Sequence, residues 1–411
     1  VVAHERPVAT VPLHAERGLH YLRDDAGRPF LIHGDTAWSL IADLSRNETE
    51  IYLADRRARG FNTILVSLIE HKFALAAPRN AYGEAPFAAG EDFATPNDAY
   101  FRHADWVLTR ARDLGFLVLL APSYIGWVGG DEGWWTAMVR AGPERLRSYG
   151  RFLGERYRAF DNIVWVAGGD DDPPDRSLVE AVALGIKDAA PRHLHTSHNG
   201  IGTRADLYWE DATWLDLWTV YQARDTCERT GDAYRAAGLR PLFLIEGHYE
   251  NEHGAGPQRV RQQAYHALLC GAGGHVYGNN PIWHFKHKGL FPAPADWWQS
   301  LGSGGAVSMT RLGDLFQSLP WWRLVPDLDG RLLIEGARRE TDKDRAVAAY
   351  TADGALAVVY SPSARSLVLD VAHLEAAITA ARWVDPVSGQ SRAVDLAGGG
   401  GNDTRWRAAT P

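Results

Sequence analysis

Cysteine, positive charge and long apolar runs are all scarce in this sequence of 411 residues. Lys and Arg total 43 against 51 Asp and Glu, for a net charge of −8. The basic residues are scattered, so the chain lacks the basic patch that binding to nucleic acid requires. No apolar run is long enough to span a membrane. The two cysteines, Cys227 and Cys270, fall in predicted helices without paired or metal-type spacing, so we expect them to say little about the redox compartment.

Several motifs of common enzyme classes are also missing. There is no G-x-S-x-G nucleophile elbow and no cysteine placed for catalysis, which argues against an esterase or a protease. Residues 33–36 do not form a glycine-rich phosphate turn, which argues against a doubly wound nucleotide-binding sheet. The histidine pairs His248 with His253 and His284 with His287 lack a third ligand. We therefore predict no cofactor and no catalytic metal, and a non-catalytic metal stays an open alternative.

The sequence does contain a repeated alternation of short apolar runs and amphipathic helices. Unbroken apolar runs are typical of parallel strands buried on both faces. The predicted strands lie at 29–33, 61–69, 116–121, 162–170, 193–198, 215–221, 242–246 and 275–277. The main predicted helices lie at 98–114, 144–160, 177–189, 225–237 and 257–270. Eight strands with intervening helices over roughly 300 residues predict a (β/α)8 TIM barrel.

The pattern changes on both sides of this barrel. Residues 1–18 are mixed in character and read as an N-terminal arm. After Leu319 and Pro320, short strand-like runs alternate with turn residues such as those at 352–354 and 385–389. We therefore predict three units: the arm at 1–18, a catalytic barrel at 19–319 and an antiparallel β-sandwich at 320–411.

Two of the predicted strands end in a carboxylate. The strand at 242–246 ends in Glu246, and the strand at 162–170 ends in Gly169 and Asp170. In a (β/α)8 barrel, the carboxyl ends of the strands carry the chemistry. A pair of acids at one opening is what glycoside hydrolysis needs. Each acid has a structural alternative: Glu246 as a buried acid paired with an arginine, and Asp170 as a helix cap or an acid of a solvated turn.

Other polar and aromatic residues follow the predicted strands, and we expect them to bind the substrate. Asp35 could hydrogen-bond sugar hydroxyls or hold its own loop, and Glu70 with His71 could bind hydroxyls or form a structural ion pair. Tyr221 could donate a hydrogen bond that keeps Glu246 ionised. The aromatic residues could stack on a sugar or fill the core. The full set of expected substrate-binding residues is Asp35, Trp38, Glu70, His71, Tyr124, Trp127, His198, Asn199, Tyr221, Tyr249, Tyr277 and Trp283. The aromatic-rich segment 72–98, which has little periodicity, is predicted to be an ordered loop beside the site.

Several motifs in one order resemble the apiosidase-like glycoside hydrolases. They are HGDTAWS at 33–39, RGFNTI at 59–64, YGRFLGERY at 149–157, NIVWVAGGD at 162–170, the strand that ends in Glu246, and HVYGNNPIWHF at 275–285. The resemblance covers nearly the whole chain. It implies a (β/α)8 barrel followed by a small β domain once described as collagen-binding. It also implies an acid/base at the end of strand four, here Asp170, and a nucleophile at the end of strand seven, Glu246.

One position departs from the wider clan of these barrels. Much of that clan carries an Asn-Glu pair at the end of strand four, whereas this chain has Gly169 and Asp170. The shorter side chain of Asp170 must lie closer to the leaving oxygen. The sequence leaves open whether Asp171 or Asp172 shares its role.

The resulting hypothesis is a retaining, exo-acting glycoside hydrolase with apiose-like or other furanose specificity. The two carboxyl groups should then lie about 5 to 5.5 Å apart, whereas a separation beyond about 6.5 Å would favour inversion. The alternatives are an arabinofuranosidase or galactosidase on the same barrel, and a carbohydrate-binding protein on a decayed enzyme scaffold. The expected partner is a carbohydrate, with neither nucleic acid nor membrane. The chain begins at Val1 rather than Met, so we expect a periplasmic or secreted protein, with a cytoplasmic location as the alternative.

Overall fold

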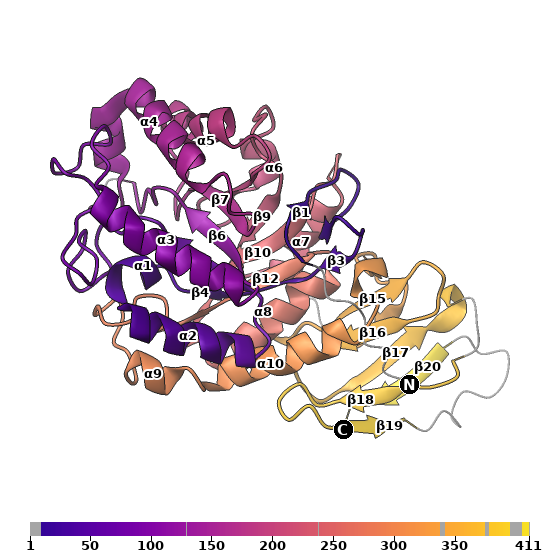
Figure 1. Ribbon diagram of the computed structural model, residues 1–411. Helices are drawn as coiled ribbons and strands as arrows, with labels where there is room; N and C mark the ends of the chain where they lie inside the picture. Colours follow the sequence, from indigo (N-terminus) through magenta and orange to yellow (C-terminus); the bar gives the residue numbers. More distant parts are fainter. Residues whose placement is uncertain are drawn as a thin grey trace.

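A computed structural model describes residues 10–128, 130–236, 238–337, 342–374, 378–394 and 405–410. Within this part of the chain, eight parallel strands form the nearly closed barrel that the sequence predicts, in the order β8-β7-β6-β5-β4-β12-β10-β9 (Figure 1). Their bounds are β4 Ile32–Thr36, β5 Thr63–Ser67, β6 Leu117–Ala121, β7 Ile163–Gly168, β8 Leu194–His198, β9 Trp218–Tyr221, β10 Leu242–Glu246 and β12 Gly274–Asn279. Each falls on or beside one of the eight predicted runs.

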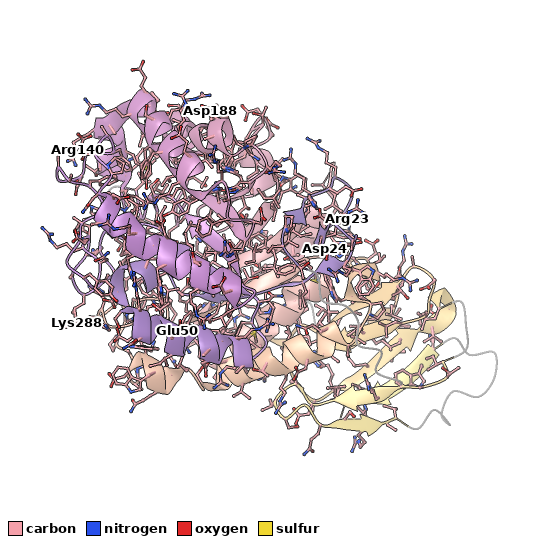
Figure 2. All side chains as sticks on the ribbon, in the orientation of Figure 1. Arg23, Asp24, Glu50, Arg140, Asp188 and Lys288 are labelled. Atoms are coloured by element: carbon pink, nitrogen blue, oxygen red, sulfur yellow. A yellow bond between two sulfur atoms is a disulfide. The ribbon has the colours of Figure 1, made fainter. Side chains whose placement is uncertain are left out.

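Helices surround the barrel and cover the outer faces of its strands (Figure 1). The longer ones are α2 Arg46–Ala58, α3 Asp98–Asp113, α4 Trp135–Tyr157, α5 Arg176–Ala189, α7 Thr226–Tyr234, α8 Pro257–Leu269 and α10 Gly304–Gln317. The four-residue helices are α1 Leu40–Asp43, α6 Ala205–Tyr208 and α9 Trp297–Ser300. Charged side chains such as Glu50, Arg140 and Asp188 lie on the outer surface of this layer (Figure 2). Up to residue 97, where α3 follows, segment 72–98 has turns and one isolated bridge but no helix or named strand, as predicted.

Helix α4 is longer than the sequence suggests. The prediction placed a helix at 144–160, whereas α4 begins at Trp135 and contains a kink at Gly142, which has a φ of 72°. Pro143 follows the kink and cannot donate a backbone hydrogen bond, so it suits the first turn of a new helical segment. In the sequence, the Gly-Pro pair therefore resembles the start of a helix. The prediction missed the helical turns of α4 that precede this pair.

The strands are buried on both faces. Interior side chains such as Leu65, Leu119, Val166 and Phe243 form one apolar cluster, and alternate residues of the same strands pack against the helices. This two-sided burial explains why the strands read as unbroken apolar runs.

A small antiparallel sheet closes the amino end of the barrel. It consists of β1 Leu13–His14, β2 Leu22–Asp24 and β3 Pro29–Phe30. Leu13, Leu22 and Phe30 all belong to the interior cluster, so this sheet plugs the end opposite the strand exits. Strand β1 lies within the predicted arm at 1–18, of which residues 1–9 are outside the described part.

After α10 the chain forms small antiparallel sheets, as expected for a C-terminal β domain (Figure 1). One sheet contains β13 Leu324–Pro326, β15 Val347–Thr351 and β16 Ala357–Tyr360. A second contains β14 Leu333–Glu335, β17 Ser366–Asp370 and β20 Arg405–Ala409, and a third pairs β18 Arg382–Val384 with β19 Ser391–Ala393.

The β domain packs on the helices that follow β9 and β10. The ring of Tyr360 stacks on Tyr265 of α8, with centroids 4.2 Å apart and an interplanar angle of 6°. Arg345 reaches Glu228 of α7 at 3.2 Å, and the backbone oxygen of Arg345 lies 3.0 Å from the ring nitrogen of His266. The β domain thus holds α7 and α8 against the barrel. None of the helices in the described part of the chain combines the length and the apolar character that a bilayer crossing needs.

Cys227 and Cys270 form a disulfide, which corrects the expectation from the sequence. Cys227 lies in α7 and Cys270 directly follows α8, 43 residues later. The pairing depends on the packing of two successive helices side by side around the barrel. The spacing of the cysteines in the sequence therefore did not indicate it. The bond links the helices on either side of β10 in sequence.

Removal of this bond should destabilise the protein. The disulfide closes a long loop and so restricts the unfolded chain. We expect Cys227→Ser combined with Cys270→Ser to lower the free energy of unfolding by about 2–4 kcal/mol. Denaturant unfolding with and without a thiol reductant measures the effect. Reductant should destabilise the wild type and leave the double variant unchanged, and an insensitive wild type would contradict the bond.

Candidate active site

Glu246 is turned toward the barrel opening by a β-bulge. In β10, Phe243 and Ile245 point into the barrel, so a regular alternation would direct the next residue toward the helices. Between β9 and β10, however, Leu244 pairs with Val220 while Glu246 pairs with Tyr221, which leaves Ile245 as an extra residue. Such a bulge changes the direction of the following side chain. It places Glu246 opposite Tyr221 at the carboxyl end of the strands.

His198, at the end of β8, connects the two candidate acids. Its Nδ1 accepts a hydrogen bond from the backbone N–H of Asp170 at 2.7 Å. Because Nδ1 is the acceptor, the proton of a neutral ring is on Nε2, which lies 2.7 Å from Oε2 of Glu246 and donates to it. Oε1 of Glu246 accepts no hydrogen bond from the described residues. His198 thus holds one oxygen of Glu246 and leaves the other open to a substrate.

The turn that carries Asp170 requires glycine before it. Gly168, Gly169 and Asp170 have φ values of 87°, 140° and 51°, a run that side chains other than glycine rarely adopt. A Cβ on Gly169 would lie 2.3 Å from the ring of Tyr124. The aromatic ring therefore packs directly on the backbone of this turn. Asp170 itself is held in a strained conformation, as is common at functional sites.

Burial raises the pKa of Asp170 to about 6, and the charge of Glu246 adds to this rise. His198 and a side-chain hydrogen bond with Tyr221 act in the opposite direction. Tyr221 thus acts on the pKa of Asp170, and among the described residues it forms no hydrogen bond with Glu246, which corrects one detail of the prediction. The site can therefore hold a proton on Asp170 in mildly acidic solution.

Aromatic rings surround these acids. Trp38 lies 5.3 Å from Tyr124 and 5.7 Å from His198 between ring centroids. Its indole N–H donates to the hydroxyl of Tyr249 at 3.0 Å, and Tyr249 in turn packs against Trp283 at 6.3 Å. These rings form an apolar wall of the kind that packs on the faces of sugars. The structure thus brings Trp38, Tyr124, His198, Tyr221, Tyr249 and Trp283 together around Asp170 and Glu246.

Asp35 lies outside this group. It is fully buried, accepts a hydrogen bond from Tyr52 at 2.6 Å and lies 3.6 Å from Arg56. Both partners belong to α2, so Asp35 faces the helix layer rather than the opening. Of the two roles weighed for Asp35, the structural one fits this position.

Glu70 and His71 organise the start of the long loop. Glu70 accepts hydrogen bonds from the backbone N–H groups of His71, Lys72 and Phe73 at 3.0, 3.1 and 3.0 Å. The ring of His71 lies 2.9 Å from the carbonyl oxygen of Asp131 and 3.3 Å from Glu91. These contacts hold loops together and do not reach the two acids.

Asn199 and the acids after Asp170 hold the neighbouring loops. Asn199 donates to Asp172 at 2.9 Å and accepts from the indole of Trp209 at 3.1 Å. Asp172 also accepts from Thr203 at 2.5 Å. Asp171 accepts from the backbone N–H of Val128 at 3.0 Å. Since these loop bonds occupy both acids, Asp170 is the member of the run that faces Glu246.

Tyr277 is buried, whereas Trp127 is exposed. Tyr277 is buried against α10, where its hydroxyl donates to Glu250 and lies 3.0 Å from Ser303. Glu250 accepts from the backbone N–H of Gly305 at the start of α10, so this cluster anchors a helix. Trp127 has 62% of its surface exposed, on the loop that contacts Asp171. Tyr277 is thus a core residue, and Trp127 is free at the rim.

Sequence reasoning missed two acids of the opening. Glu252 accepts a hydrogen bond from the indole of Trp283 at 2.7 Å, and burial followed by the charge of Glu246 raises its pKa to about 7. Glu132 is close enough to Asp170 to raise the pKa of that residue as well. Both lie in irregular loops rather than at a strand exit, so strand position gave no signal. The described residues contain no group of three His, Cys, Asp or Glu side chains arranged to hold a metal ion.

A (β/α)8 barrel with acids and aromatic rings at the carboxyl ends of its strands has the construction of a barrel glycoside hydrolase, and this protein belongs to that class of enzyme. Residues 16–323 match the family described as "Apiosidase-like, catalytic domain", and the chain is a member of this family. A carbohydrate is therefore its substrate.

Solved structures share the fold. A glycoside hydrolase family 5 protein from Bacteroides vulgatus has a TM-score of 0.81 and 24% identity, over 93% of this chain and 87% of its own. A second structure, described as a glycoside hydrolase, has the same TM-score and identity over 94% and 92%. An endo-1,4-β-D-mannanase from Thermotoga petrophila aligns with a TM-score of 0.51 and 14% identity, over 70% of this chain and 100% of its own. No curated protein matches the sequence.

The raised pKa of Asp170 predicts a stability cost at high pH. The pKa is about 6 in the folded protein against an ordinary value of 3.8, so the folded state binds the proton more tightly. Stability is therefore lost as pH rises from about 4 through about 6. We expect Asp170→Asn to raise the melting temperature by about 1–3 °C at pH 8 and to leave it nearly unchanged at pH 4.

Calorimetry at both pH values tests this prediction. Asp161→Asn, at an exposed position, is the matched control and should have no pH-dependent effect. A destabilised Asp170→Asn protein at pH 8 would contradict the prediction.

Proposed function

We propose that this glycoside hydrolase cleaves a terminal glycosidic bond with retention of configuration, with Glu246 as nucleophile and Asp170 as acid/base. The observation that carries the proposal is the bridge through His198, which bonds the backbone of Asp170 and the carboxylate of Glu246, each at 2.7 Å. One buried ring thereby sets the positions of both acids relative to each other.

The reaction follows from this arrangement. The free Oε1 of Glu246 attacks the anomeric carbon, while protonated Asp170 gives its proton to the departing oxygen. The bond to the leaving group breaks and a glycosyl ester forms on Glu246. Asp170, now ionised, takes a proton from water, and the resulting hydroxide oxygen attacks the same carbon and releases Glu246. The product keeps the anomeric configuration of the substrate.

Two neighbours support these roles as positioning residues. His198 fixes the direction of Glu246 with a single donated hydrogen bond. Tyr221 lowers the pKa of Asp170, and its ring centroid lies 5.1 Å from that of His198. For retention, we expect the two carboxyl groups to lie about 5 to 5.5 Å apart in the substrate complex.

For the substrate we propose a single terminal sugar, apiose-like or another furanose. Support comes from the family match and from the aromatic wall of Trp38, Tyr249 and Trp283, which are all buried. An arabinofuranosidase or galactosidase activity would use the same acids and differ in the contacts to hydroxyls.

We also propose a periplasmic or secreted location. The disulfide between Cys227 and Cys270 supports it, because such bonds persist mainly in oxidising compartments. A reduced pair in protein isolated from its native cells would contradict this proposal.

The two acids should respond differently to the leaving group. Glu246→Gln should lower kcat by at least about 10⁴-fold on every aryl glycoside, because the nucleophile is lost. Asp170→Ala should lose much more activity on a poor leaving group than on 2,4-dinitrophenolate, which departs without a proton.

Kinetics on a panel of aryl glycosides check both expectations, and ¹H NMR of the first product shows its anomer. Unchanged hydrolysis by Glu246→Gln would refute the nucleophile. An inverted product would refute double displacement.

The pH profile should reflect the proton on Asp170. Because the leaving group needs that proton, we expect kcat/KM to fall as pH rises through about 6. The observed midpoint belongs to the pair of acids rather than to one residue. Rates between pH 4 and 9 on a poor leaving group measure it. Asp170→Ala assayed with 2,4-dinitrophenyl glycosides should lack this decline, and a decline of equal size there would assign it to another group.

A further inference from the structure

Glu252 lies in a tightly constrained turn beside the site. Its neighbours Asn251 and His253 have φ values of 71° and 50°, both in the left-handed region that side chains other than glycine seldom adopt. The turn is held by backbone hydrogen bonds from Asn251 to Ala255 at 2.8 Å and from Ala255 back to Glu252 at 2.8 Å. The Asn251 side chain also donates to the carbonyl of Asn280 at 3.1 Å. These backbone conformations and hydrogen bonds fix the position of Glu252 in the turn.

The side chain of Glu252 is oriented by the aromatic wall. Its Oε1 accepts from the indole N–H of Trp283 at 2.7 Å. The Trp283 ring packs at 5.0 Å on Phe73 and at 6.3 Å on Tyr249. Oε2 of Glu252 accepts no hydrogen bond within the described part of the chain. Glu252 therefore offers one fixed, unused carboxylate oxygen.

This oxygen belongs to the same opening as Glu246. The charges of Glu246 and Glu252 each raise the pKa of Tyr249, and the charge of Glu246 raises that of Glu252. No lysine, arginine or histidine in the described residues forms an ion pair with Glu252, and its one side-chain donor is the neutral indole of Trp283. Glu252 is partly buried, and a partly buried carboxylate without a cation is stabilised by hydrogen-bond donors. A bound sugar can supply them through its hydroxyl groups.

We propose that Glu252 is a specificity-determining residue that accepts a hydrogen bond through Oε2 from a hydroxyl of the terminal sugar. The inference rests on the proposed function, and it narrows the ligand to a neutral sugar with a hydroxyl at the position that faces Glu252. A carboxylate on the sugar would be repelled by Glu246 and Glu252 together.

A purely structural role makes a different prediction. If Glu252 only braces Trp283, Glu252→Gln keeps the brace, because the amide oxygen still accepts from the indole. The amide then places an NH₂ donor where the free carboxylate oxygen was. A sugar hydroxyl that donates to Oε2 would lose its acceptor, whereas Trp283 would keep its partner.

The experiment compares wild type, Glu252→Gln, Glu246→Gln and the control Glu210→Gln. Glu210 is exposed, so the control makes the same chemical change away from the site. The substrates are the aryl glycoside that wild type hydrolyses fastest in a library and its analogues that each lack one hydroxyl. Melting temperatures establish that every variant is folded.

At pH 8, where Glu252 is ionised, we expect Glu252→Gln to lower kcat/KM on the parent glycoside by about 10- to 100-fold, the effect of one hydrogen bond to a charged acceptor. For wild type, kcat/KM on one deoxy analogue should be lower than on the parent glycoside by a similar factor. On that analogue, kcat/KM of Glu252→Gln should be less than about 3-fold below that of wild type. The control should match wild type on all substrates.

The outcomes distinguish a failure of the proposed role of Glu252 from a failure of the proposed hydrolase function. If Glu246→Gln is inactive but Glu252→Gln ranks every analogue as wild type does, this inference is overturned and the proposed function stands. If Glu246→Gln hydrolyses normally, or wild type hydrolyses no glycoside in the library, the proposed function is refuted and this inference with it.

Discussion

The two hydrogen bonds of His198 are the interaction on which the site depends. One fixes the backbone of Asp170, the other fixes the carboxylate of Glu246, and the ring that makes both is buried. Asp170 follows β7 and Glu246 ends β10, and these two strands are not neighbours in the barrel. The rigid ring at the end of β8 relates them through these two hydrogen bonds. Catalysis by paired carboxylates needs this kind of preorganisation, because small shifts in position are costly.

The surrounding fold supports an arrangement that is unfavourable by itself. Asp170 and Glu252 are partly buried acids with raised pKa values, and the turns that carry them contain left-handed backbone. The opposing stabilisation comes from the apolar cluster inside the barrel and from the layer of helices around it. The disulfide and the β domain both act on α7 and α8, the helices that flank β10 in sequence. The disulfide and the β domain therefore brace the two helices next to the strand that carries Glu246.

The strands and both acids were predictable because their signal is local. An apolar run that ends in a carboxylate is read directly from consecutive residues, as for Ile163 to Asp170 and Leu242 to Glu246. Asp35 and Asn199 follow predicted strands in the same way, yet they face helices or loops. Their direction depends on alternation and on partners far away in sequence, which a strand pattern does not contain. Glu252 was missed for the opposite reason, since it comes from a turn and not from a strand end.

By itself the sequence determined the barrel, the later β domain and the positions of Asp170 and Glu246 at strand ends, because apolar periodicity and turn chemistry are properties of neighbouring residues. Only the tertiary structure decided which side chains meet. Four features depend on contacts between residues of different elements. They are the bulge at Ile245, the tautomer of His198, the pairing of Cys227 with Cys270 and the contact of Glu252 with Trp283. Such contacts arise from the closure of the sheet, which brings distant strand ends to one opening.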